Sequence, residues 1–237
     1  MANFVLVHAA WHGGWEWRRV AQRLRAAGHE VFTPTLTGCG ERSHLLSRDI
    51  GLDTHLRDVG NLILWEDLQD VVLAGHSYSG TVVTGVADQL SERIRARVYF
   101  DAFVPRDGQS TMDLTPDWRK QEIIDLARTD GEGWYVPPHH AERWVSDPED
   151  RAWLQSKVTA QPLKTLTDPV HLTGAVSRVP GIYVLSAAFK PSPFWQFYEA
   201  LQAAPGWRLF QLPTLHDAMI SMPDDVTAIL QSAAGDA

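Results

Sequence analysis

One feature limits what this 237-residue chain can fold into more than any other: an apolar run that leads directly into glycine, histidine and serine. Residues 71–80 read VVLAGHSYSG, and residues 81–87 have the composition of a buried helix. This order predicts a strand, a sharp turn and a helix, with Ser77 on the turn. Gly75 and Gly80 flank the serine and leave room for a strained backbone. Such a turn exposes the hydroxyl, so we interpret Ser77 as a nucleophile; the alternative is a glycine- and serine-rich turn without chemistry.

Apolar runs of strand length alternate with helical patterns along most of the chain. One helix is expected to bury Trp17 and Leu24 and to end at Gly28, and further helices are expected near 53–64, after Ser77, at 194–203 and from Pro223. The alternation predicts an α/β fold: a mostly parallel sheet of about six strands with helices on both faces. Ligands then bind at the carboxyl ends of the strands. The expected strands are 3–8, 30–33, 70–74, 97–101, 181–186 and 207–212.

Residues 105–179 interrupt the alternation and are rich in tryptophan, proline and charge. We expect this insertion to form a helical cap without strands, above Ser77, between a first core part (1–104) and a second core part (180–237). An ordinary surface insertion is the alternative. The cap is favoured because the insertion leaves from the carboxyl end of a strand, where the site is expected. At least one of its tryptophans should face the pocket, out of Trp118, Trp134, Trp144 and Trp153.

Composition excludes several classes of partner. A formal net charge of −8 argues against nucleic acid. No segment is long enough to span a bilayer, and the apolar run near the N-terminus has no basic residues before it, so neither a membrane nor a signal peptide is expected. The single cysteine, Cys39, excludes an internal disulfide and fits a reducing cytoplasm. The histidines lack ligand spacing, so no metal is expected. The oligomeric state stays open, with a homodimer as one alternative.

A general base for Ser77 is expected late in the chain. Enzymes with a serine on such a turn place the acid after it and the histidine last. His216 follows the last predicted strand and precedes the last helix, so we assign it as the base; a loop histidine without a role is the alternative. The usual place for the acid is the segment 187–193, after the strand 181–186. That segment contains no carboxylate.

Asp101 is the preferred acid. It follows an apolar strand, where an unpaired charge would be costly, and His216 is the candidate partner. Asp217 is a weaker candidate, because the immediate neighbour of His216 would have to fold back on its own chain. A carboxylate in the insertion, or a pair of Ser77 and His216 without an acid, stays open.

The oxyanion of the reaction needs two backbone N–H donors. One should come from Tyr78, directly after the nucleophile, and the other from the glycine-rich loop after the first strand, where Ala10 is the best candidate. The alternative for this loop is a simple strand-to-helix turn with no particular donor. Trp11, Phe103 and Trp134 are the expected pocket residues, with core packing as their alternative role.

Together these residues resemble the small, cofactor-free α/β-hydrolases that include plant methylesterases, plant hydroxynitrile lyases and bacterial carbendazim-hydrolysing methyl carbamate esterases. The resemblance implies an α/β-hydrolase fold, no cofactor and a small-molecule ester or carbamate as substrate. It covers most of the chain outside the insertion. The segments that carry the resemblance are FVLVH at 4–8, HGGW at 12–15, TPTLTG at 33–38, ERSHL at 41–45, GHSYSG at 75–80, YFDAFVP at 99–105 and HDAM at 216–219.

Several positions depart from the pattern of these relatives. Ala9 stands where they usually have glycine, and Phe189 stands where the plant enzymes carry the acid. Haloalkane dehalogenases are similar to this chain in having the acid after the strand that follows the nucleophile, which supports Asp101. The plant lyases have a lysine after the catalytic histidine and a threonine in the oxyanion loop. Here these positions are Asp217 and Ala10, which disfavours a lyase.

We therefore expect a serine hydrolase that cleaves a small, aromatic or otherwise apolar ester or carbamate. Ser77 would attack the carbonyl, His216 would move the proton, and Asp101 would orient His216. A ligand-binding protein on a hydrolase scaffold is the main alternative, and a carbon–carbon lyase is the weaker one.

Overall fold

A computed structural model describes residues 1–139 and 141–235 of the chain, and its centre is a parallel sheet of six strands. The strand order is β2-β1-β3-β4-β7-β8. All six predicted strands are present, with ends shifted by up to three residues, and the predicted α/β fold with helices on both faces is confirmed. The strands are β1 (Asn3–Val7), β2 (Glu30–Phe32), β3 (Val71–His76), β4 (Ile94–Phe100), β7 (Gly181–Ser186) and β8 (Trp207–Leu212).

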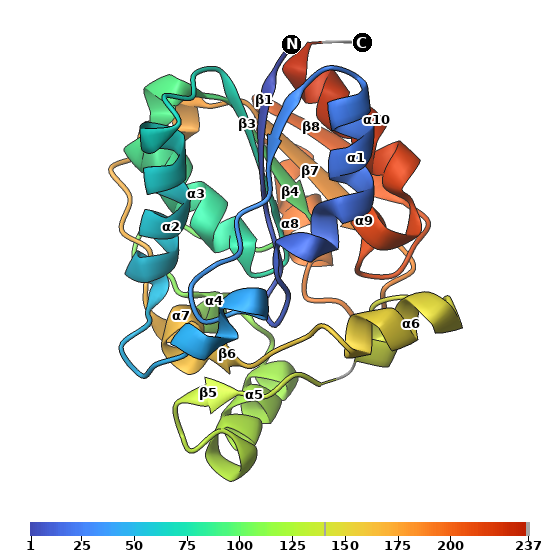
Figure 1. Ribbon diagram of the computed structural model, residues 1–237. Helices are drawn as coiled ribbons and strands as arrows, with labels where there is room; N and C mark the ends of the chain where they lie inside the picture. The colour runs from blue at the N-terminus through green and yellow to red at the C-terminus, as the bar shows by residue number, and fades with distance from the viewer. Residues whose placement is uncertain (140, 236–237) are drawn as a thin grey trace.

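The central strands are covered on both faces, which explains their continuous apolar runs. Every residue of β3 and of β7 is buried. Helices α2 and α3 lie on one side of the sheet, and α1 and α10 on the other (Figure 1). The helices of the core are α1 (Arg18–Ala26), α2 (Leu52–Trp65), α3 (Ser79–Gln89), α8 (Trp195–Leu201), α9 (Ala218–Ser221) and α10 (Pro223–Ala234). Short 3-10 helices are η1 (Gly14–Trp17), η2 (Gly40–Leu45) and η3 (Ser91–Arg93).

Helix α1 follows the predicted pattern closely. It buries Val20, Ala21 and Leu24 against the sheet. Gly28 follows the helix with a φ of +86°, a left-handed conformation that costs glycine little and turns the chain into β2.

Most of the insertion, residues 105–167, lies at the carboxyl ends of the strands, at the end of the sheet opposite the N-terminus, and residues 168–179 run back beside α3 to the start of β7 (Figure 1). It is mostly helical, but the expectation that it contains no strands was wrong. The strands β5 and β6 pair in an antiparallel manner, with Tyr135 opposite Pro162. They are too short for a period-two pattern to show in the sequence. The elements are α4 (Thr111–Leu114), α5 (Asp117–Asp130), β5 (Tyr135–Val136), η4 (Ala141–Arg143), α6 (Pro148–Gln155), β6 (Gln161–Pro162), α7 (Leu163–Thr167) and η5 (Ala175–Arg178).

No helix in the described part of the chain is both long and apolar enough to cross a membrane.

Candidate active site

The turn between β3 and α3 holds Ser77 in a strained conformation. Its φ is +55°, in the left-handed region that residues other than glycine rarely adopt. Two hydrogen bonds tie the turn to the end of β4: the Ser77 N–H donates to the Phe100 carbonyl at 3.2 Å, and the Phe103 N–H donates to the Ser77 carbonyl at 3.1 Å. These hydrogen bonds hold the turn in its strained conformation. Strained backbone that its surroundings hold in place is typical of functional sites.

The glycines of this turn are required by close packing. A Cβ on Gly75 would lie 2.7 Å from the Ser79 carbonyl oxygen, and a Cβ on Gly80 would lie 2.0 Å from the Phe103 carbonyl oxygen. Gly80 stands three residues after Ser77, so the turn departs from a strict G-x-S-x-G pattern. Ser79 occupies the position two residues after the nucleophile, and its hydroxyl donates to the His8 carbonyl. That hydrogen bond joins the turn to the loop after β1.

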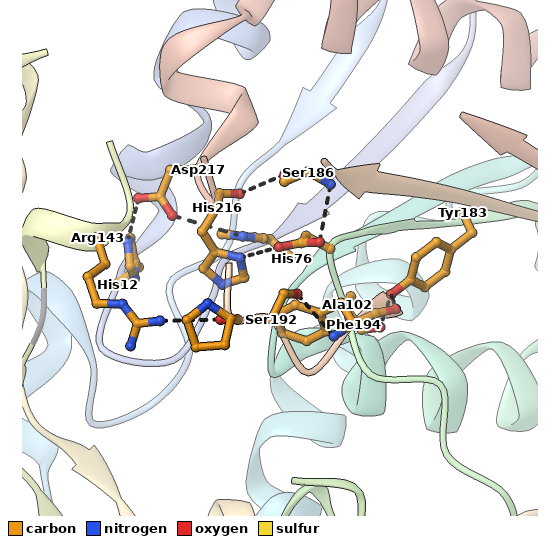
Figure 2. A network of polar contacts seen from close by, with 12 residues as sticks. His12, His76, Ala102, Arg143, Tyr183, Ser186, Ser192, Phe194, His216 and Asp217 are labelled. Atoms are coloured by element: carbon orange, nitrogen blue, oxygen red, sulfur yellow. Dashed lines mark hydrogen bonds and ion pairs between the residues drawn. The ribbon is translucent and has the colours of Figure 1, made fainter. Parts of the chain in front are cut away.

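His216 and Asp101 come from two different strand ends and meet in a hydrogen bond. His216 Nδ1 lies 2.6 Å from Asp101 Oδ2. Asp101 directly follows β4 with a φ of +43°, and the N–H of Ser186 donates to its other oxygen at 3.2 Å. The Ser186 hydroxyl donates to the His216 carbonyl at 3.3 Å, so the end of β7 supports both partners (Figure 2).

These contacts leave His216 as a neutral proton acceptor. Burial lowers the pKa of His216 well below its usual range, and the neighbouring His76 acts in the same direction. Since Nδ1 donates to Asp101, Nε2 carries the free lone pair. Burial raises the pKa of Asp101, and the Ser186 N–H opposes that shift. Ser77 and His216 line the same cavity, although no hydrogen bond joins the Ser77 hydroxyl to a described residue.

Two phenylalanines form an apolar wall against the His216 ring. Phe189 stacks on it with ring centroids 4.7 Å apart, and Phe194 stacks on it at 5.1 Å with an interplanar angle of 8°. Phe189 stands where the resemblance to plant enzymes would place an acid. In this structure an aromatic ring packs against the imidazole from that position, and the carboxylate of Asp101 contacts Nδ1 of the same imidazole.

The β1 loop, residues 8–16, has its peptide groups fixed by buried side chains. His8 Nδ1 donates to the Ala9 carbonyl at 2.7 Å, and His8 Nε2 accepts the N–H of Leu36. Burial lowers the pKa of His8 to about 3, so this ring is neutral. The Ala9 N–H donates to Glu16 at 2.8 Å, and the Trp11 N–H donates to Gln161 at 3.2 Å.

None of these contacts uses the N–H of Ala10. Within the described residues, no hydrogen bond uses the N–H of Ala10 or that of Tyr78. Both residues line the cavity that contains Ser77 and His216. The Ala9 carbonyl, which belongs to the same peptide group as the Ala10 N–H, is held from behind by His8. The geometry therefore leaves these two predicted donors uncommitted beside the serine.

His12, within this loop, is a buried imidazolium. Its Nδ1 lies 2.8 Å from the Ala10 carbonyl oxygen and its Nε2 lies 3.2 Å from Asp217 Oδ2. Both partners are acceptors, so both nitrogens carry protons. Burial opposes the charge, but the carboxylates of Glu16 and Asp217 outweigh it and raise the pKa of His12 to about 9. The ion pair of His12 and Asp217 thus clamps the Ala10 peptide (Figure 2).

His76 extends the same network to the base. Its Nδ1 makes a short contact with Glu16 Oε1, and its Nε2 lies 4.0 Å from Asp217 Oδ1. Burial opposes protonation, but Glu16 raises the pKa of His76 overall. The His76 ring lies against the His216 ring, with centroids 4.3 Å apart. Asp217 therefore contacts His12 and His76, and the hydrogen bond to His216 is made by Asp101.

His76, His216 and Asp217 are the one group of metal-ligand type in the described part of the chain. Two ligands of a tetrahedral zinc ion lie about 3.3 Å apart, since each lies about 2.0–2.1 Å from the metal. The 4.0 Å between His76 Nε2 and Asp217 Oδ1 exceeds that spacing. We assign the three groups to the imidazole–carboxylate network.

A cavity opens above Ser77 between the core and the insertion. Trp11 and Phe103, both predicted, line it. The insertion contributes Trp118, Trp144 and Ile123, together with two arginines. Trp11 stacks on Trp144 with centroids 6.1 Å apart, which joins the β1 loop to the insertion. The upper wall is therefore aromatic.

Trp134 is not among the residues that line the cavity, so its expected pocket role was wrong. Its ring packs edge-on against Tyr135, its indole N–H donates to Glu132, and the Arg48 guanidinium lies over it. Trp134 directly precedes β5 and is partly exposed, and its carbonyl accepts the N–H of Leu163, directly after β6. The sequence showed an aromatic residue in the insertion but not the side of the hairpin on which it lies.

Several residues of the site escaped sequence reasoning. From the sequence, no role is assigned to His12, Glu16 or Gln161. Glutamate between two tryptophans in an apolar helix turn was a usable signal, because a buried carboxylate requires a partner. Nothing local marked Gln161, whose partner Trp11 is distant in the sequence.

The comparisons with known proteins agree with this geometry. A model described as the alpha/beta hydrolase family matches residues 4–229. The chain belongs to the alpha/beta hydrolase family. A carbendazim hydrolyzing esterase from Nocardioides sp. (strain SG-4G) is 43% identical over 95% of this chain and 97% of that protein. The pFDCC methylesterase MES16 of Arabidopsis thaliana is 27% identical over 98% of this chain and 94% of that protein.

Among solved structures, an extracellular alpha/beta-hydrolase from a Paenibacillus species superimposes with a TM-score of 0.87 at 24% identity, covering 98% of this chain and 99% of that one. At that identity the likeness shows the shared fold. The full-length esterase relative and the family match together support an esterase, as the sequence predicted.

Proposed function

We propose that this protein hydrolyses small carboxylic esters or carbamates, with an aromatic or apolar part, through an acyl- or carbamoyl-enzyme on Ser77. The observation that carries the proposal is the 2.6 Å hydrogen bond between His216 and Asp101 at a cavity that also holds Ser77. Burying a charged group at the end of an apolar strand is costly in free energy unless a partner hydrogen-bonds to it. Here the partner is an imidazole whose second nitrogen is free.

In the first step, Ser77 attacks the substrate carbonyl while His216 Nε2 accepts the hydroxyl proton. The imidazolium that forms is stabilised by Asp101, which also holds the tautomer. The N–H groups of Ala10 and Tyr78 donate to the developing oxyanion. The structure supports these two roles by leaving both N–H groups without a partner among the described residues.

The tetrahedral intermediate then collapses, and His216 returns the proton to the leaving alcohol or amine. Water attacks the acyl or carbamoyl carbonyl in the second half, with His216 again as base. The neutral state of His216 at pH 7 suits this cycle, because a base that is already protonated cannot accept the serine proton. The aromatic upper wall favours substrates with a flat apolar part.

The substrate class is supported by relatives as well as by the cavity. The relative at 43% identity is named for carbendazim hydrolysis, so a methyl carbamate belongs in the first assay set beside methyl esters. Methyl benzoate, p-nitrophenyl acetate and carbendazim cover aryl ester, activated ester and carbamate. The test is turnover of this set by the wild-type protein and by Ser77→Ala.

Wild-type protein should hydrolyse at least one member of the set with a burst of the first product, and a fluorophosphonate probe should label Ser77. Ser77→Ala should lose activity by several orders of magnitude and should not be labelled, while it keeps the fold and ligand affinity. Near-native turnover in purified Ser77→Ala would remove the hydrolase mechanism. Ligand binding without turnover in the wild type would instead favour the scaffold as a binding protein.

A further inference from the structure

Positive charge gathers in the wall of the cavity although the chain as a whole is acidic. Arg119 of α5 and Arg143 of η4 line the cavity, and the His12 imidazolium that also lines it is paired with Asp217. No aspartate or glutamate is among the described lining residues, and the chain carries a formal net charge of −8. An apolar cavity with cations and no carboxylate favours an anionic ligand, because its charge is not screened by bulk water.

Arg143 has donors that the protein does not use. Its Cζ lies 5.5 Å from the Phe189 ring centroid, and Nη2 donates to the Pro191 carbonyl at 3.2 Å. Neither of these two contacts is with a carboxylate. A guanidinium carries five N–H donors, so most of them remain for water or a ligand. Figure 2 shows Arg143 on the same side of the site as His12 and His216.

Arg119 provides a second, more buried guanidinium. Its side chain is 14% exposed, and its Cζ lies 5.8 Å from the ring centroid of Trp11. Nη1 lies 2.5 Å from Glu122, on the outer part of the same helix. Burial lowers the pKa of Arg119, Glu122 opposes this, and the Arg143 guanidinium lowers it further. The two cations therefore repel each other across the cavity wall, and an anion between them would relieve that repulsion.

Each guanidinium lies over a ring that belongs to the reaction centre. Arg119 lies over Trp11, the neighbour of the oxyanion donor Ala10, and Arg143 lies over Phe189, which stacks on His216. Such stacking holds a guanidinium plane in place and leaves its edge free for a planar oxyanion.

We propose that the preferred substrate is an aromatic ester or carbamate that bears a carboxylate, which Arg143 and Arg119 bind. This inference rests on the proposed function and names its substrate class. The competing role for the two arginines is structural: they would attach the insertion to Trp11 and Phe189 without contacting substrate. In that case a neutral and an anionic ester would respond equally to their removal.

The test compares esters that differ only in charge. One pair is 4-carboxyphenyl acetate and its neutral isostere 4-carbamoylphenyl acetate, with the charge on the leaving group. The other pair is monomethyl terephthalate and methyl 4-carbamoylbenzoate, with the charge on the acyl part. For at least one pair, kcat/KM of the wild type should be about tenfold or more higher for the anionic member, as for one favourable ion pair in a shielded site. The preference should shrink as salt is added.

Arg143→Gln should lower that preference at least fivefold, chiefly through KM, and Arg143→Lys should restore part of it. Arg128→Gln is the matched control, because Arg128 lies on α5 but outside the cavity lining. It should keep the wild-type preference. A wild type with no preference for the anionic members, or an Arg143→Gln variant with the same preference as Arg128→Gln, would overturn the inference while leaving the hydrolase intact.

Calorimetry separates failure of the inference from failure of the proposed function. Ser77→Ala should bind benzoate more tightly than benzamide, and the double variant Ser77→Ala, Arg143→Gln should lose the difference. Equal affinities would overturn the anion site whatever the turnover data show. Tighter benzoate binding in a wild type that hydrolyses none of the four esters would support the anion site and contradict the hydrolase.

Discussion

The two walls of the cavity are built on different physical principles. The core wall carries Ser77, Asp101 and His216 with the β1 loop, and hydrogen bonds between distant segments hold its buried imidazoles and carboxylates. The insertion wall meets the site through ring stacking and through guanidinium groups with spare donors. Hydrogen-bonded networks are expensive to alter in part, whereas ring contacts tolerate exchange. The chemistry is therefore fixed on one side and the choice of substrate is adjustable on the other.

The largest effect in this comparison is expected at Asp101. Asp101→Asn keeps the shape of the core wall but presents an amide to His216 Nδ1 and favours the wrong tautomer. We expect kcat to fall by about 10³- to 10⁴-fold with little change in KM. Steady-state kinetics on a p-nitrophenyl ester would measure this. A loss below tenfold would show that Asp101 does not serve the base.

Asp217 should matter less, because its contacts are with His12 and His76, whereas Asp101 makes the hydrogen bond to the base. Asp217→Asn weakens the clamp on the Ala10 carbonyl, and we expect kcat to fall by about 10- to 100-fold, the scale of losing part of an oxyanion interaction. The measurement is kcat in parallel with Asp101→Asn, on protein shown to be folded by circular dichroism. Equal losses in the two variants would contradict the separate roles of the two carboxylates.

Stability should depend on pH through His12. Its folded pKa of about 9 lies above the unfolded value of 6.5, so its contribution is fully present below pH 6.5 and is lost as pH rises through 9. From His12 alone, the free energy of unfolding should fall by at most about 1.4 kcal/mol per pH unit in this range. Urea unfolding at pH 6, 7.5 and 9 would test it. In the control variant His12→Gln, the free energy of unfolding should depend less on pH. A wild-type stability that is unchanged or rises over this range would contradict a buried imidazolium.

The pKa of His216 predicts a different pH response for activity. Because burial holds it well below 6.5, the base stays unprotonated in mildly acidic solution. The kcat/KM of a neutral ester should therefore stay level from pH 7.5 down through pH 6 and fall only at lower pH. An apparent pKa near 6.5 in the pH–rate profile would indicate an ordinary, solvated imidazole.

The smallest effect is expected in the insertion wall, where Trp118 and Trp134 form a matched pair. Trp118 lines the cavity and Trp134 does not. Trp118→Ala should change the ratio of kcat/KM for aryl over small alkyl esters by about three- to tenfold, since one aromatic contact is worth about 1 kcal/mol. Trp134→Ala should leave the ratio unchanged. An equal response of both variants would mean that these rings affect only the packing of the insertion.

The sequence predicted the residues of the core wall better than those of the insertion wall. The strand ends, the serine turn and the partnership of Asp101 with His216 followed from apolar runs and from the cost of a charge after an apolar strand. These signals are local, or they follow from where parallel strands end. The choice among Trp118, Trp134 and Trp144 depended on a hairpin of two-residue strands, which leaves no periodic trace. The pairing of His12 with Asp217 joins the two ends of the chain, and no local pattern encodes it.

Phe189 has a consequence for how this scaffold can be modified. With the carboxylate partner of His216 supplied by the end of β4, the connection at 187–193 packs against the imidazole and contributes no carboxylate. Its composition is therefore open to grafting, provided that a flat apolar ring still covers the imidazole and a carbonyl still accepts from Arg143. In a relative that keeps its acid after β7, the same graft would remove the carboxylate. Loop exchange at this junction therefore works in one direction. A loop from such a relative can replace residues 187–193 here, whereas residues 187–193 cannot replace the loop of that relative.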